Sequence, residues 1–364
     1  MKITAVEPFI LHVPIGKHIE DSVNRVDVWG LPGCVIRTDE GVEGVGYTST
    51  QLGGDAEIHA VIRDAYAPVL LGQDPMRTRA LWDACYWSSI HWVGRAGITA
   101  MAQSAVDIAL WDLKARALGL PLWRLLGGHK DRVKSYNTDG GWLNLSVDEL
   151  IRQLGALLEA GWDAVKMKVG SPDPRADVQR VRAVRRTLGY GFDLMVDANQ
   201  IWDLGTARKV APRLEPYEIT WLEEPLAPDD VRSHALLQQS TRIPLALGEH
   251  IYAPVAFRDF ILANAVQYVQ VDCTRIGGVT PWMDVAALAH AFNVNVVPHH
   301  ADMMRVHPHL AAASPAAAMI ECILWLQDVF VEPLRIERGV FHLSETPGAS
   351  TAVRPEAFAR YRVA

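Results

Sequence analysis

The sequence lacks the features that mark several classes of protein. Its four cysteines are scattered and form no CxxC pair, so we expect buried free thiols in a reducing compartment. No apolar run approaches about 20 uncharged residues, which argues against a membrane span. The N-terminal stretch is interrupted by Glu7 and Pro8 and lacks the pattern of a secretory signal, so a cytoplasmic location is expected.

Long runs of charge of one sign are also missing. The formal net charge of -7 and the pI near 6.0 come from intermixed acidic and basic residues, so neither a nucleic-acid partner nor a membrane surface is expected. A length of 364 residues leaves room for one barrel of roughly 200 to 250 residues and a second, smaller domain.

What the sequence does contain is a repeated design between residues 164 and 249. Four short apolar runs, AVKMK, DLMVD, ITWLE and LALGE, each stop on a charged side chain, namely Lys168, Asp197, Glu223 and Glu249. The three carboxylates are spaced 26 residues apart, which is typical of successive βα units in a parallel barrel. Each one alone could simply cap the following helix.

Three carboxylates at the C-terminal rim of adjacent strands would form a metal site. Their hard oxygen ligands suit Mg²⁺ better than Zn²⁺, and Mn²⁺ could substitute. Four further strands are expected at VKSYN, YVQVD, NVVPH and AMIEC. The last three carry Asp272, His299 and Glu321 at or near their ends, on the same catalytic rim.

The segment before the barrel has mixed structure. We expect a strand over residues 1–14, a polar irregular loop of about 16 residues from 15 to 30, and a hairpin over 34–49. Helical signals dominate residues 56–118, with Val106, Ala109, Leu110, Leu113 and Ala117 on one face. After Trp325 a hairpin-like tail is expected to return to the N-terminal domain.

In these motifs the chain resembles the enolase superfamily, mandelate racemase subgroup. The resemblance rests on AQSAVDIALWDLKARALGLPLWRLLGG, KMKVG, VDANQ, WLEEP and ALGEH, together with Asp272, His299 and Glu321, and it covers essentially the full length. It implies an α/β fold: a modified TIM barrel, (β/α)7β, over residues 128–325. An α+β capping domain over 1–127 would be completed by the C-terminal segment 326–364. It also implies a homo-oligomer, commonly an octamer.

The resemblance assigns roles that the side chains could fill unaided. Lys168 would remove the proton α to a substrate carboxylate, its pKa lowered by neighbouring Lys166. His299, oriented by Asp272, would be the second acid or base. Glu321 would donate a hydrogen bond if burial keeps it protonated. The alternatives are a solvated lysine pair, a loop histidine and a structural glutamate.

Substrate contacts are expected from the cap loops and from residues near the metal. The residues proposed for this role are His18, Arg25, Gln51, Asn199 and His300, which favour a polar substrate. Alternatively, the cap residues face solvent and Trp29, Trp87 or Trp92 shape the pocket.

The sequence departs from the family pattern after His299, where about two extra residues precede the next helix. His300, Arg305, His307 and His309 could line the pocket, or could begin a helix with exposed histidines. A separate metal site there is not expected, since Asp302 is the only nearby carboxylate.

The same chemistry permits several reactions. The motifs from KMKVG through RIGGVTP are similar to those of galactarate and talarate dehydratases, so the expected reaction is loss of water from a sugar acid to give a 2-keto-3-deoxy acid. A cycloisomerase, racemase or epimerase acting on a sugar acid or its lactone is the main alternative. A non-catalytic carbohydrate-binding protein on the same barrel is the third.

Overall fold

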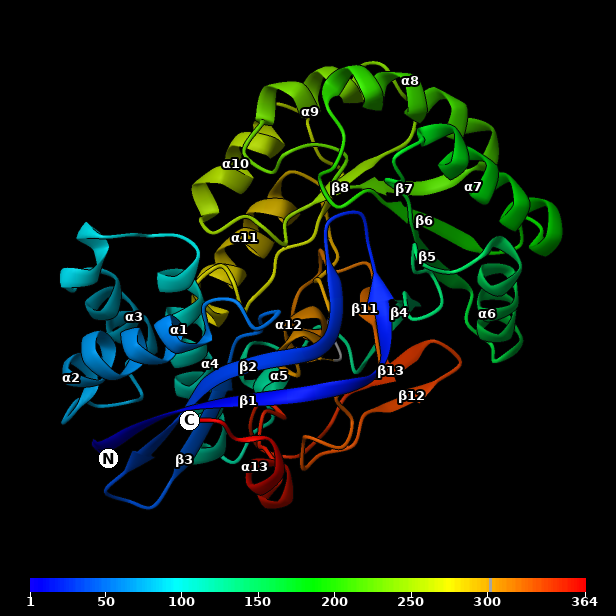
Figure 1. Ribbon diagram of the computed structural model, residues 1–364. Helices are drawn as coiled ribbons and strands as arrows, with labels where there is room; N and C mark the ends of the chain where they lie inside the picture. The colour runs from blue at the N-terminus through cyan, green and yellow to red at the C-terminus, as the bar shows by residue number, and fades with distance from the viewer. Residues whose placement is uncertain (301–302) are drawn as a thin grey trace.

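The computed structural model describes residues 1–300 and 303–364. The chain folds into a cap and a barrel that contact each other. In Figure 1 a barrel of strands surrounded by helices occupies the upper right, and an N-terminal sheet with its helices lies below and to the left. The expected fold class is confirmed. No helix among these residues is long and apolar enough to cross a bilayer.

The N-terminal sheet is antiparallel, in the order β1 (Ile3–Glu20), β2 (Arg25–Thr38) and β3 (Glu43–Tyr47). The expectation of an irregular loop over residues 15–30 was wrong, because β1 and β2 continue as a hairpin whose turn lies at residues 21–24. Ile15, Ile19 and Val26 are buried, whereas residues 16–18 are exposed in succession. The strict alternation of a strand is therefore interrupted here, where the pairing of β1 with β2 shifts register between Pro14 and Ile19.

The cap helices pack against this sheet. They are α1 (Asp55–Val61), a π-helical turn (Ile62–Tyr66), α2 (Ala67–Leu70), α3 (Thr78–Tyr86), a 3-10 turn (Ser89–Trp92), α4 (Ile98–Ala117) and α5 (Leu122–Leu125). On β3, a Cβ at Gly44 or Gly46 would lie 2.1 or 2.0 Å from a backbone oxygen of α4, so glycine is what allows the helix to lie on the strand. Of the predicted helix face, Ala117 is exposed and the rest is buried.

The barrel strands are β4 (Arg132–Asn137), β5 (Ala164–Lys168), β6 (Asp193–Asp197), β7 (Ile219–Glu223), β8 (Leu245–Leu247), β9 (Tyr268–Val269), β10 (Asn295–Val296) and β11 (Ile320–Cys322). Neighbours pair in parallel from β4 to β10, and β11 pairs with β4. A parallel bridge between Val296 and Ala317 connects β10 to the segment that leads into β11. Eight strand positions therefore surround one core.

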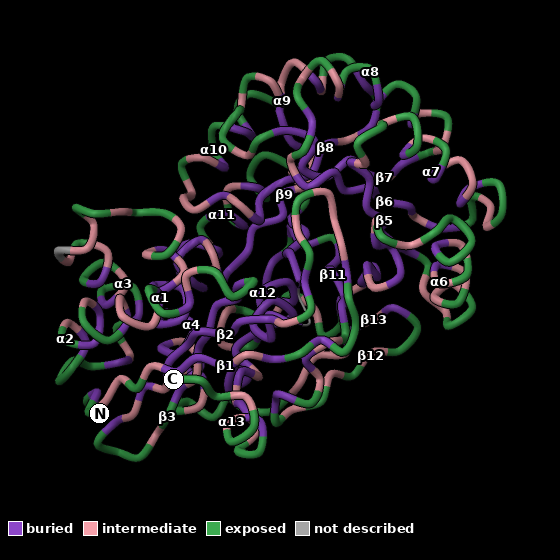
Figure 2. Tube along the Cα trace, viewed as in Figure 1, coloured by how far each residue is buried: buried purple, intermediate pink, exposed green. Residues whose placement is uncertain are grey.

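The helices between these strands form the outer layer: α6 (Val147–Glu159), α7 (Pro174–Leu188), α8 (Leu204–Leu214) with a 3-10 turn (Glu215–Tyr217), α9 (Val231–Gln238), α10 (Pro254–Leu262), α11 (Val279–Ala291) and α12 (Val306–Ala313). Figure 2 shows the strands buried and the outer faces of these helices exposed. Both faces of every barrel strand are covered, so side chains along the strands are mostly apolar. Polar side chains are instead found at the C-terminal ends of the strands, at one rim of the barrel.

The C-terminal tail behaves only partly as expected. Its hairpin, β12 (Arg335–Glu337) and β13 (Val340–His342), pairs with β4 of the barrel instead of the cap. The residues beyond it do return to the cap, where α13 (Pro355–Tyr361) leads into a bridge between Arg362 and Leu11. Figure 1 shows the C-terminus beside the N-terminal sheet.

One buried carboxylate ties the cap to the barrel. Asp107 of α4 accepts hydrogen bonds from the backbone N and the Oγ1 of Thr280, at 2.8 and 2.9 Å, in the first turn of α11. We expect Asp107→Ala to lower the free energy of unfolding by about 2 kcal/mol, because it removes a helix cap and leaves buried donors unpaired. Urea unfolding measures this loss.

The matched control is Asp284→Ala on α11, the helix whose first turn Asp107 contacts. Asp284 forms an exposed ion pair with Arg79 of α3, so its removal should change stability by less than about 0.5 kcal/mol. Equal effects of the two substitutions would show that Asp107 does not serve as the interdomain cap.

Candidate active site

The predicted metal ligands lie at one rim of the barrel. Asp197 and Glu223 are the last residues of β6 and β7 and are register partners, and Glu249 follows the end of β8 by two residues. All three are buried. Burial, together with the charge of Asp197, raises the pKa of Glu223 to about 8, so this rim has an excess of negative charge that a cation would relieve.

Two lysine side chains form ion pairs with these carboxylates. Lys166 Nζ lies 2.5 Å from Glu223 Oε1 and 3.7 Å from Asp197 Oδ2, while Lys168 Nζ lies 2.5 Å from Asp197 Oδ2. Nearby, the Oδ1 atom of Asn199 is buried without a hydrogen-bond partner among the described residues. Three carboxylates and an unpaired amide oxygen are hard ligands of the kind Mg²⁺ takes, so the residues fit that ion.

The three carboxylates do not converge as one tight group. Among the described residues, the groups whose ligand atoms lie within 4.8 Å of one another are Glu224 with Glu249 and His250, and His299 with His300 and Glu321. Glu249 turns toward the histidines, with its Oε2 3.0 Å from His299 Nε2. Asp197 and Glu223 face the lysines instead.

Lys168 does not have the lowered pKa that the sequence led us to expect. Burial is the largest influence and lowers its pKa, and Lys166 lowers it too. The carboxylates of Asp197, Asp21 and Glu223 together outweigh both and hold the pKa of Lys168 above its ordinary value. The expectation of a lowered pKa therefore fails for this ion-paired arrangement. Lys168 nonetheless lines the cavity described below, with its ammonium 5.3 Å from the ring centre of Trp142.

His299 and Asp272 form the predicted pair. The His299 Nδ1 lies 2.9 Å from Asp272 Oδ2, and the other oxygen of Asp272 accepts hydrogen bonds from Thr274 N and Oγ1. Burial lowers the pKa of His299, but Glu249 and Asp272 outweigh it and raise the pKa to about 10. The imidazole is therefore a proton donor at neutral pH in this arrangement.

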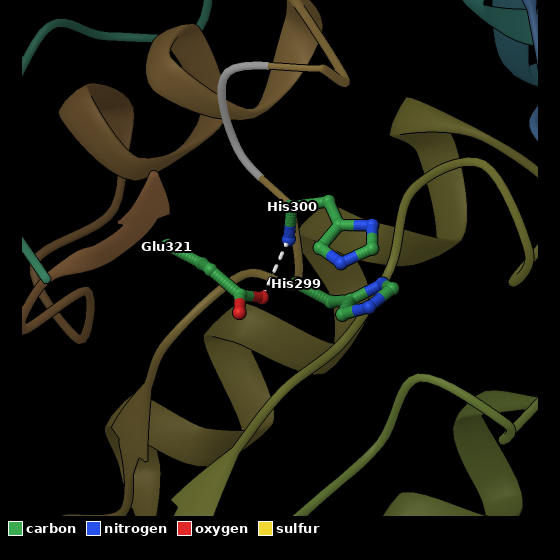
Figure 3. Close-up of side chains that lie close together, drawn as sticks. All are labelled: His299, His300 and Glu321. Carbon is green, nitrogen blue, oxygen red and sulfur yellow. Dashed lines mark hydrogen bonds between the residues drawn. The ribbon is translucent and has the colours of Figure 1, made fainter. Parts of the chain in front are cut away.

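Glu321 is not the protonated group that was expected. Burial is the largest influence and raises its pKa, but Lys166 at 2.8 Å, together with His299 and His300, outweighs burial and holds the pKa of Glu321 well below its usual range. Its oxygens also accept hydrogen bonds from Thr138 Oγ1 and from the backbone N of His300. Figure 3 shows the second of these bonds and the stacked rings of His299 and His300, whose centres are 3.6 Å apart.

The residues after His300 correct another expectation. Arg305, His307 and His309 are buried at the start of α12, so they are not exposed histidines, and none of them lines the cavity. His307 Nε2 accepts a hydrogen bond from the backbone N of Cys273, while His309 contacts Ser350. They pack the helix against the barrel. Asp302 lies outside the described residues.

A cavity of about 300 Å³ lies between this rim and the cap hairpin. Lys168, His299 and three of the predicted substrate-binding residues, Gln51, Asn199 and His300, line it. The other two predicted residues do not line it. His18 is held on the outer face between Asp27 and Glu20, and Arg25 is 78% exposed and paired with Glu20.

Sequence reasoning missed other parts of the lining, including Trp142, Tyr252 and Arg275. Arg275 follows Asp272 by three residues just beyond a strand end, a position that the strand-end rule could have found. Of the tryptophans offered as alternative walls, Trp29 does line the cavity. Trp87 and Trp92 do not, and their side chains are exposed.

Comparison with known proteins places these features in a family. The N-terminal domain profile of mandelate racemase and muconate lactonizing enzyme matches residues 31–127, and the enolase C-terminal domain-like profile matches residues 149–357. L-Talarate/galactarate dehydratase of Salmonella typhimurium is 38% identical over 322 residues, which are 88% of this chain and 80% of that protein.

Two further relatives cover nearly the whole chain. The 3,6-anhydro-alpha-L-galactonate cycloisomerase of Streptomyces coelicolor is 33% identical over 362 residues, 99% of either protein. The crystal structure of L-talarate dehydratase from Polaromonas sp. JS666, complexed with Mg and L-glucarate, has a TM-score of 0.92 and 36% identity over 99% of this chain and 97% of that one.

Proposed function

The chain belongs to the mandelate racemase and muconate lactonizing enzyme family of the enolase superfamily, and from this premise we propose that it is a Mg²⁺-dependent sugar-acid dehydratase. It would remove the proton α to the substrate carboxylate and expel a β-hydroxyl as water, giving a 2-keto-3-deoxy acid. The observation that carries the proposal is the cavity that Lys168 and His299 both line, above buried carboxylates at successive strand ends.

Asp197, Glu223 and Glu249 would hold the metal ion, with Asn199 nearby. When bound, Mg²⁺ supplies positive charge that stabilises the anion formed at the substrate carboxylate, an effect of several kcal/mol, and competes with Lys168 for Asp197. The Mg-complexed relative of known structure supports this assignment.

The chain's own residues divide the proton transfers. Lys168 removes the α-proton through Nζ, which requires it to lose its proton, and Lys166 holds Glu223 and Glu321 in place beneath it. His299 donates the proton from Nε2 to the leaving hydroxyl, which fits its raised pKa. Asp272 keeps the imidazole oriented by accepting from Nδ1.

The strand order supports the assignment of a separate base and acid. Lys168 ends β5 and His299 follows β10, while Asp197 and Glu223 end β6 and β7 and Glu249 follows β8 between them. A base and an acid reaching one cavity from separate strands is what removal of a proton and departure of a hydroxyl require.

Loss of water is the outcome to measure. We expect the Mg²⁺-loaded protein to convert at least one sugar acid to a product 18 mass units lighter that reacts as a 2-keto acid, because His299 can protonate the β-hydroxyl. Mass spectrometry of a panel of sugar acids tests this. A product of unchanged mass would favour the alternative, a cycloisomerase, racemase or epimerase, which the full-length Streptomyces relative supports.

We also propose a homo-oligomer, an octamer being the form expected for the family, in the cytoplasm. Sedimentation analysis of the purified chain measures the first of these.

A further inference from the structure

The charges around the cavity are unevenly distributed. Its cationic side chains, Lys168, His250, Arg275 and His299, all come from the barrel. Each lies beside a carboxylate of the same rim: Lys168 beside Asp197, His250 beside Glu224, and Arg275 and His299 beside Glu249. One substrate carboxylate is therefore expected at the barrel floor, where the cations and the proposed metal ligands lie.

The cap side of the cavity carries the opposite charge. Its polar lining consists of Asp21, Asn24, Trp29, Ser49, Thr50 and Gln51. Within residues 1–300 and 303–364, Asp21 is the only ionisable side chain that the cap contributes to this lining, and no lysine or arginine accompanies it. A second substrate carboxylate at this end would face a like charge, and the cap supplies no cation to offset it. Lys168 of the barrel interacts electrostatically with Asp21, but it already pairs with Asp197.

The hairpin tip holds Asp21 in place. Its Oδ1 accepts hydrogen bonds from the backbone N of Val23 and of Asn24, at 2.8 and 2.7 Å. The neighbouring Ser22 Oγ donates to the backbone oxygen of Ala198 at 2.8 Å, which fastens the tip to the barrel. The carboxylate is therefore fixed at the cavity by the cap hairpin.

The cations of the same hairpin are turned away from the cavity. Lys17 pairs with Asp139, with its ammonium 5.3 Å from the ring centre of Trp325. Arg25 lies in the solvent, 3.3 Å from Glu20. Neither compensates the charge of Asp21 inside the cavity.

Neutral hydrogen-bonding groups complete this end. The indole nitrogen of Trp29 and the hydroxyl of Ser49 are buried and have no hydrogen-bond partner among the described residues. The same holds for the indole nitrogen of Trp142, a barrel residue whose ring lies 5.3 Å from the Lys168 ammonium. All three residues line the cavity. Neutral donors with unmet hydrogen-bonding capacity match hydroxyl groups.

We infer that the substrate carries a single carboxylate, as an aldonic acid or its anhydro form does, and that Asp21 discriminates against sugar diacids. The inference rests on the proposed function and specifies its substrate class. The carboxylate binds at the barrel floor, and the far end of the substrate, a hydroxyl-bearing chain, meets the cap.

The test compares five- and six-carbon aldonic acids with the aldaric acids of matching configuration, using the Mg²⁺-loaded protein and detection of 2-keto products. We expect kcat/KM for the best aldonic acid to exceed that of its matching diacid by about tenfold or more. A ratio of this size is what the repulsion between two like charges, here Asp21 and a second substrate carboxylate, produces at the intermediate dielectric constant of a partly exposed site.

Asp21→Asn isolates the charge, because asparagine keeps the oxygen that accepts from Val23 and Asn24. We expect this variant to raise the diacid-to-monoacid ratio of kcat/KM about fivefold or more. The matched control, Asp27→Asn, lies on the same hairpin outside the cavity lining and should leave the ratio unchanged.

The possible outcomes separate the two proposals. Faster turnover of a diacid than of its matching monoacid, or an unchanged ratio in Asp21→Asn, would overturn the inference and leave the dehydratase function standing. Failure of every acid to lose water or to exchange its α-hydrogen with deuterium oxide would overturn the proposed function and this inference together.

Discussion

Replacing Lys168 by alanine, or His299 by asparagine, is expected to lower kcat for dehydration about a thousandfold or more. Each substitution removes one of the two cavity groups that we assign to proton transfer, and general acid–base catalysis contributes factors of about 10² to 10⁴ for each group. Steady-state assay of 2-keto product on the preferred acid measures both losses.

The two variants should differ in exchange of the α-hydrogen. Lys168→Ala should lose exchange with deuterium oxide, because the proposed base is gone. His299→Asn should retain it, because Lys168 is still present and only the proton for the leaving hydroxyl is missing. Nuclear magnetic resonance of the recovered substrate separates these results.

Lys134→Ala is the control for the lysine substitution. Lys134 lies on β4 at the opposite rim, where it pairs with Asp163 and Asp193, and its loss should leave kcat within twofold. Mg²⁺ affinity should stay within a few fold in Lys168→Ala and His299→Asn. Full activity in either variant would refute its proposed role.

Removal of Mg²⁺ is expected to abolish turnover and to lower thermal stability. A ligand bound only by the folded state adds about 2.7 kcal/mol of stability at a hundred times its dissociation constant, so Mg²⁺ should raise Tm in a concentration-dependent way. Chelation followed by readdition of Mg²⁺, monitored by differential scanning calorimetry, tests this independently of activity.

Glu223→Gln should remove most of the stabilisation by Mg²⁺. Its side chain is buried at the end of β7, and an amide supplies no negative charge to the ion. We expect Mg²⁺ affinity, measured by titration calorimetry, to fall at least about thirtyfold. Glu218→Gln, an exposed residue just before the same strand, should change it little.

Mg²⁺ affinity should also depend on pH. Burial and the neighbouring Asp197 raise the pKa of Glu223 to about 8, so a proton competes for this carboxylate below that pH. Affinity should therefore weaken as pH falls from 8 to 6, and Glu223→Gln should lose this part of the dependence. Unchanged affinity in the variant would exclude Glu223 from the ligand set.

The sequence by itself determined the barrel and the chemical identity of its rim. Apolar runs that end on Asp197, Glu223 and Glu249 at a constant spacing identify parallel strand ends, because the carboxyl ends of such strands share one rim. The same rule found Lys168, Asp272 and His299. Local periodicity is enough for these assignments.

Only the tertiary structure decided which rim side chains are charged and which hairpin side chains face the cavity. Glu321 is ionised because it lies against Lys166 of β5, and Lys168 is held protonated because it lies against Asp197 at the end of the neighbouring β6. The sequence spacing predicts that these strand ends share a rim, but it does not reveal which side chains pair there. Which hairpin residues face the cavity depends on strand register, where a shift of one residue exchanges the two faces. That is why Asp21 lines the cavity while His18 and Arg25, chosen from composition, do not.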